Sequence, residues 1–174
     1  MYRSVAYYAI HMGIESEKEL GEIAKSLKFE MNPKDQKLLV NGEFLGQKLR
    51  SQTVSQMASH VSKFRKVRES LTRRQRSIGK EWSLKFPVVV EGRDIGTVVF
   101  PDVEFKFFVT ADPKIRAHRR YLELKRNGKR VSLKKILAEN NKRDDQDSNR
   151  KVAPLRCPDD AVVVDTSSLS INQV

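Results

Sequence analysis

The sequence has 174 residues, with 34 Lys and Arg against 22 Asp and Glu, and therefore a formal net charge of +12. This length can bury a real hydrophobic core, recurrent Val, Leu, Ile and Phe clusters exclude wholesale disorder, and no apolar run approaches the roughly 20 residues that cross a bilayer. A single cysteine, Cys157, excludes an internal disulfide and predicts a cytoplasmic protein, while the positive charge predicts anionic partners.

The first half of the chain predicts helices around a short hairpin. Apolar residues at helical spacing predict helices over residues 5–12 and 20–27. Turn residues at 32–35 separate two strand-like runs and predict a hairpin. Residues 50–79 predict two successive helices, so the segment before residue 86 has the character of an insert of helices and one hairpin.

The second half predicts strands that alternate with helices. Continuous apolar runs bounded by Gly and Pro predict buried strands at 87–90, 97–101, 104–111 and 161–165. Asp112 followed by Pro113 predicts the start of a helix that ends near residues 127–128. Ser132 predicts the cap of another helix, and residues 169–174 predict the opening of a last one. This alternation is typical of an α/β domain with a layered core.

Metal and nucleophile chemistry find no support in the sequence. His11, His60 and His118 are scattered and show no ligand spacing. Cys157 has no second cysteine or paired histidine near it in the sequence. We therefore expect no metal-ligating residues and a structural thiol.

Two charged segments are candidates for anion binding. On a helix, Arg143, Asp147 and Arg150 share one face, so two guanidiniums with a carboxylate between them could grip a phosphate or sugar hydroxyls. Spacing alone favours a solvated ion-pair stripe over this fork. The second segment, residues 91–96, follows a predicted strand and offers Arg93 between glycines; a ligand loop and a plain strand-end turn are equally compatible with it.

The segment from Lys63 to Lys85 is rich in Lys and Arg. Arg65, Arg68 and Arg76 fall near one face of the predicted helix, which is compatible with binding RNA or DNA phosphates. Phe64 and Trp82 are the only aromatic residues within 63–85, so the stacking pattern of single-strand binders is missing there. A basic helix that serves solubility is the alternative.

Taken in order along the chain, these motifs resemble bacterial cytidylate kinase (CMP kinase), of the nucleoside monophosphate kinase superfamily. The resemblance covers the whole chain and is most specific in GRDIGTVVFPD at 92–102 and RDDQDSNRKVAPL at 143–155. It implies transfer of the γ-phosphoryl group of ATP, with Mg²⁺, to CMP or dCMP. It also implies a P-loop kinase-like α/β fold: a three-layer core with a parallel sheet at 1–14 and 86–174, an NMP-binding insert at 15–85, and a helical lid at about 113–150.

The resemblance also implies roles for individual residues. Those at the acceptor nucleotide are Tyr2, Arg3, Ser59, Arg68, Glu91, Asp94, Arg143 and Asp147. Those that act on the phosphates during catalysis are Arg93, Arg119, Arg120 and Arg150. Among the first set, Ser59, Arg68 and Asp94 would read the cytosine edge, because a carboxylate can accept from its exocyclic amine. We expect CMP or dCMP and ATP as partners, no membrane or nucleic acid, and a monomer.

The sequence departs from the family pattern in three places. Glu91 stands where the family usually has Asp, and residues 79–86 form a longer stretch than expected. No G-x-x-x-x-G-K-[ST] motif occurs in the 174 residues. The interpretation at this point is a truncated form whose first strand and P-loop lie upstream of Met1, poorly stable and inactive alone; the alternative is an inactive nucleotide- or RNA-binding remnant.

Overall fold

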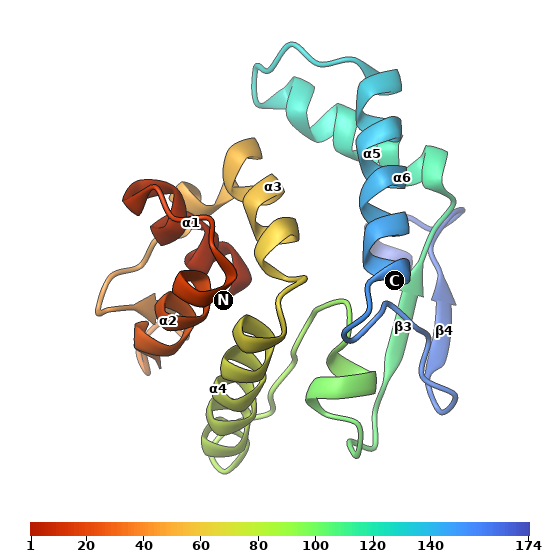
Figure 1. Ribbon diagram of the computed structural model, residues 1–174. Coiled ribbons are helices and arrows are strands. Elements are labelled where there is room, and N and C mark those ends of the chain that lie inside the picture. Colours follow the sequence, from red (N-terminus) through yellow and green to blue (C-terminus); the bar gives the residue numbers. More distant parts are fainter. The chain divides into compact units, whose positions relative to one another are not determined.

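The computed structural model describes all residues from 1 to 174, and they divide into two compact units, Met1–Glu91 and Gly92–Val174. The first unit is helical with one small hairpin, and the second combines helices with a parallel pair of strands (Figure 1).

Four helices build the first unit around a continuous apolar core. They are α1 (Tyr2–Met12), α2 (Glu17–Ser26), α3 (Gln52–Val61) and α4 (Arg65–Ser83), with a 3-10 turn η1 at Gly46–Arg50. Helix α1 packs against α3, and α2 packs against α4. Val5, Leu20, Val61 and Leu71 are fully buried between them. The apolar spacing read from the sequence is therefore the spacing that forms this core.

Local signals fix the boundaries of these elements. Gly13 ends α1 in the left-handed region at φ 64°, a conformation that glycine adopts without steric cost. The Ser51 hydroxyl accepts a hydrogen bond of 3.2 Å from the Val54 backbone and caps α3. The predicted hairpin is confirmed: β1 (Phe29–Met31) pairs antiparallel with β2 (Leu38–Val40), with Phe29 opposite Val40.

The second unit contains two parallel strands and two long helices. Strand β3 (Phe107–Thr110) pairs in parallel with β4 (Val162–Asp165), with Phe107 opposite Val162. Helices α5 (Pro113–Arg126) and α6 (Leu133–Asn149) pack against each other, and a short 3-10 turn η3 spans Ile171–Gln173. The α/β class is confirmed, while the three-layer core of the P-loop kinases stays a prediction.

Two of the predicted strands are wrong. Residues 87–90 are irregular and pair with no strand, and Val89 is 97% exposed. At 97–101 the chain instead forms the π-helical turn η2 (Ile95–Val99), in which the Val99 amide donates to Asp94 and the Phe100 amide to Ile95. These backbone groups satisfy one another locally, so the β-branched residues of this run do not extend into a strand.

The strands predicted at 104–111 and 161–165 do form, but their apolar side chains are not buried. Phe107 is 65% exposed, and Val109, Val162 and Val163 are exposed as well. A two-stranded pair has two free edges and little cover on its faces, which explains why a continuous apolar run stays in contact with solvent here.

The structure groups the N-terminal helix with the insert. The sequence-based division assigns residues 1–14 to the core half, whereas α1 buries Val5, Ala6 and Ala9 in the first unit. The division into a core, an insert that binds the nucleoside monophosphate and a lid assigns functions to segments, and it stays a prediction. None of the helices combines the length and the hydropathy that crossing a bilayer requires.

Candidate functional site

Arginine and aspartate side chains from three segments of the second unit meet in one network of ion pairs. The loop after Gly92, the first turns of α5 and the C-terminal half of α6 supply them. We call this group the arginine cluster; its members are Arg93, Asp94, Arg116, Arg143, Asp144, Asp147 and Arg150. It joins the two charged segments that the sequence singled out separately.

Asp147 lies at the centre of the arginine cluster. One of its carboxylate oxygens lies 3.3 Å from Nη1 of Arg150, and the other lies 3.4 Å from Nε of Arg93 and 3.8 Å from Nε of Arg143. Positions 143, 147 and 150 fall on one helical face, so α6 and the residue that directly follows it, Arg150, align three of these residues. The predicted shared face is confirmed, and it is a partly buried cluster rather than a solvated stripe.

Arg150 is held on several sides. Its Nε donates a hydrogen bond of 2.6 Å to the Ala153 carbonyl, and its Nη2 lies 3.8 Å from the Asp94 carboxylate. Ala153 adopts φ 50°, a left-handed conformation that is uncommon for a residue with a Cβ. Arg150 and Asp94 are both largely buried, so the guanidinium is fixed before any ligand arrives.

Two members of the arginine cluster were missed by the sequence reasoning. Asp144 lies 2.6 Å from Arg116 and 3.5 Å from Arg93, and so connects α5 to the loop after Gly92. A signal for Asp144 was present, because it stands three residues before Asp147 and so falls near the same helical face. No local signal marks Arg116, because its partner is 28 residues away.

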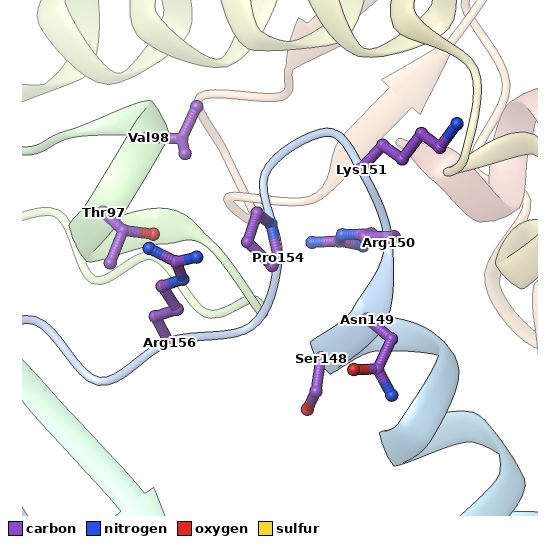
Figure 2. Close-up of a pocket in the computed structure, with 8 residues that line it drawn as sticks. All are labelled: Thr97, Val98, Ser148, Asn149, Arg150, Lys151, Pro154 and Arg156. Atoms are coloured by element: carbon purple, nitrogen blue, oxygen red, sulfur yellow. The ribbon is translucent and has the colours of Figure 1, made fainter.

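A pocket of about 580 Å³ adjoins the arginine cluster at Arg150. Figure 2 shows Arg150 and Pro154 near its middle, with Thr97 and Arg156 on one side and Ser148 and Asn149 on the other. The remaining lining residues are Val98 and Lys151. The Thr97 hydroxyl is buried and forms no hydrogen bond within the protein. Guanidinium, hydroxyl and amide groups of this kind suit an anionic ligand with several oxygens.

The electrostatics of the arginine cluster favour a phosphate. Four arginines and three aspartates leave an excess of one positive charge, and every carboxylate lies beside at least one guanidinium. Guanidinium forks match phosphate oxygens in a bidentate way, and partly buried positions strengthen such contacts.

The first unit brings together part of the predicted acceptor site. Arg68 is only 3% exposed; its Nη1 donates a hydrogen bond of 3.0 Å to Ser62, and its guanidinium lies 5.2 Å from the centre of the Tyr2 ring. Arg3 donates 2.7 Å to the Leu49 carbonyl. Ser59 lies on α3, the helix that also carries the Ser55 hydroxyl to which Arg3 donates.

The burial of Arg68 also bears on the alternative of RNA binding. Arg65 and Arg76 are exposed while Arg68 is buried, so these three guanidiniums do not form one exposed face.

The α-amino group of Met1 has a lowered pKa. Burial lowers this pKa to about 6, with a smaller contribution from the positive charge of Arg3.

Three predicted site residues lie apart from the arginine cluster. Arg119 donates to the Thr166 hydroxyl at 3.0 Å, to the Thr166 carbonyl, and to the Leu169 carbonyl at 3.1 Å. Arg120 pairs with Glu123 one turn along α5 at 2.6 Å. Glu91 is exposed in the irregular segment before Gly92. The catalytic roles of Arg119 and Arg120, and the acceptor role of Glu91, stay predictions.

Comparison with known proteins adds to this geometry. The family model described as Cytidylate kinase matches residues 1–174. The cytidylate kinase of Clostridium tetani is 43% identical over 174 residues, which is all of this chain and 75% of the relative. That of Aeromonas salmonicida is 40% identical over 178 aligned positions, covering all of this chain and 76% of the relative. That of Thermosipho melanesiensis is 42% identical, covering all of this chain and 77% of the relative. The chain therefore belongs to the cytidylate kinase family, whose members are nucleoside monophosphate kinases.

Proposed function

We propose that this chain binds CMP or dCMP and serves its phosphorylation by ATP, which yields CDP or dCDP and ADP. The arginine cluster is the observation that carries the proposal, because it gathers four guanidiniums with the carboxylates that orient them. The match of the whole chain to the cytidylate kinase family supports the same substrate class. A cytoplasmic location and a monomeric state remain predictions.

In this proposal the arginine cluster holds positive guanidinium groups beside the phosphate oxygens of the substrates. Arg93 and Arg150 contact phosphate oxygens, while Arg143 and Asp147 hold the sugar hydroxyls. In the transfer, an oxygen of the acceptor phosphate attacks the γ-phosphorus of ATP, and the bond from that phosphorus to the β–γ bridging oxygen breaks. Negative charge develops on the phosphoryl oxygens, and fixed guanidiniums stabilise it without having to reorganise.

Recognition of the base is assigned to a second set of residues. Asp94 accepts from the exocyclic amine of cytosine, a group that uracil lacks. Ser59 and Arg68 of the first unit complete the assignment to the base. Tyr2 is assigned to the acceptor nucleotide, and Arg3 to its phosphate. The contact between Arg68 and the Tyr2 ring supports this assignment, because it orders two of these side chains together.

The carboxylates of this chain are not gathered into a metal cluster. No group of three or more His, Cys, Asp and Glu side chains is arranged to hold a metal ion. The carboxylates of the arginine cluster are engaged with arginines rather than grouped around a common point. Mg²⁺ would accompany ATP as its phosphate complex.

Calorimetric titration of the purified chain with CMP, dCMP, UMP and AMP tests this proposal. We expect binding of CMP and dCMP, weaker binding of UMP and AMP, and loss of CMP binding in Arg150→Met. Equal affinity for all four nucleotides would contradict the assignment to cytosine. Binding to RNA that falls steeply with salt, without any binding of CMP, would support the nucleic-acid alternative instead.

A further inference from the structure

We propose that Asp144 is a positioning residue that holds the Arg93 guanidinium in place for the acceptor phosphate. The inference rests on the proposed function, because it assumes that Arg93 binds a phosphate. It assigns a role to a side chain that touches neither the nucleotide nor the reacting atoms.

The contacts of Asp144 form a chain of support. Its Oδ2 accepts a hydrogen bond of 2.6 Å from Nη1 of Arg116, and its Oδ1 lies 3.5 Å from Nη1 of Arg93. Arg116 is itself anchored, because its Nε donates 3.0 Å to the Ala111 carbonyl just after β3. The position of Arg93 is thereby connected through two side chains to the end of a strand.

Arg93 needs such support because its own backbone gives little. It lies in an irregular stretch between Gly92 and the start of η2, and its side chain is partly exposed. Asp147 engages its Nε and Asp144 engages its Nη1, which leaves Nη2 for a ligand. Without Asp144, one contact remains, and the guanidinium can rotate about it.

Arg116 has a second effect in this arrangement. A carboxylate beside a phosphate site would repel the ligand unless a positive charge balances it. The short contact with Arg116 supplies that charge, so Asp144 orients Arg93 at little electrostatic cost to anion binding. The Arg116–Asp144 ion pair has no net charge, so it does not repel the phosphate as an unpaired carboxylate would.

The test compares Asp144→Asn with Asp145→Asn, a matched control. Asp145 is the next residue on α6, is exposed, and forms none of the ion pairs of the arginine cluster. Both substitutions replace Asp by Asn, so they change the net charge of the chain equally. We expect Asp144→Asn to weaken CMP binding about tenfold in calorimetric titration. Cytidine has no phosphate, so its affinity should be unchanged in both variants. Asp144→Glu keeps the charge and should restore most of the CMP affinity.

A second measurement needs no nucleotide. The Nη–H resonances of Arg93 in ¹⁵N NMR should show restricted rotation of the guanidinium in the wild-type chain and in Asp145→Asn, and free rotation in Asp144→Asn. Ordered Arg93 in Asp144→Asn, or an equal loss of cytidine and CMP affinity, would overturn the inference. If the wild-type chain binds no CMP, the proposed function fails, and the NMR result still decides whether Asp144 positions Arg93.

Discussion

The Asp147 carboxylate lies 3.3 Å from the Arg150 guanidinium, and both side chains are only 6% exposed. Both charges have lost most of their hydration, and each depends on the other for compensation. The stability of the second unit and the phosphate binding proposed for it therefore depend on the same contact.

Asp147→Asn should destabilise the second unit. The change removes the charge that faces Arg93, Arg143 and Arg150 but keeps the shape of the side chain. Because Arg150 retains Asp94 and the Ala153 carbonyl, we expect a loss of about 2 kcal/mol, below the range for a fully broken buried pair. Urea unfolding followed by circular dichroism measures it. Asp145→Asn should change the free energy of unfolding little; an equal loss in both variants would contradict a specific role for Asp147.

The caps of α5 and α6 should differ in their contribution to stability. The Asp112 carboxylate accepts from the Lys114 backbone at 2.7 Å and from the Ile115 backbone at 3.3 Å. Ser132 occupies the corresponding position of α6, but its side chain makes no cap hydrogen bond. Asp112→Ala should therefore cost about 1 kcal/mol, and Ser132→Ala much less. Thermal unfolding of the two variants side by side provides the comparison, and a larger effect of Ser132→Ala would refute it.

The exposed strand pair should make the isolated chain bind apolar dyes. Val109 is 61% exposed on β3, so Val109→Thr should lower the fluorescence of bound anilinonaphthalene sulfonate with little change in stability. Val99 is 1% exposed, and there the same substitution should cost about 1 to 2 kcal/mol, because it buries a hydroxyl. Unchanged dye binding in Val109→Thr would show that the dye binds elsewhere.

Stability should rise with pH between about 6 and 8. Burial lowers the pKa of the Met1 α-amino group to about 6 in the folded chain, from 8.0 in the unfolded chain. Between these values the unfolded chain holds a proton that the folded chain lacks, so the free energy of unfolding increases with pH, by about 3 kcal/mol for this group. Below pH 6 and above pH 8 this contribution is constant.

Urea titrations at pH 6, 7 and 8 measure this dependence. A chain acetylated at Met1 is the control, because it has no amine to titrate and should lose this part of the increase. The same slope in the acetylated chain would assign the effect to groups other than the Met1 amine.

The sequence predicted most elements whose contacts are local. Asp112 marks the start of α5 through hydrogen bonds to nearby backbone amides, and the spacing of Arg143, Asp147 and Arg150 is a local property of the chain. The strand predicted at 87–90 failed because a strand needs a partner, and no partner is visible from apolar composition. Arg116 was missed for a related reason: its ion pair with Asp144 depends on the packing of α5 against α6.

Because the arginines of the cluster already face carboxylates, an incoming phosphate meets no bare positive surface. Apart from Nη2 of Arg93, it would share the existing partners of these guanidiniums, and the binding free energy is then the difference between two sets of contacts rather than the sum of new ones. A chloride ion has no pair of oxygens, so it matches a guanidinium fork less well than a phosphate does. The arginine cluster would thus bind a nucleotide phosphate in preference to chloride. Chloride should compete poorly against a nucleotide even though the chain carries a net charge of +12.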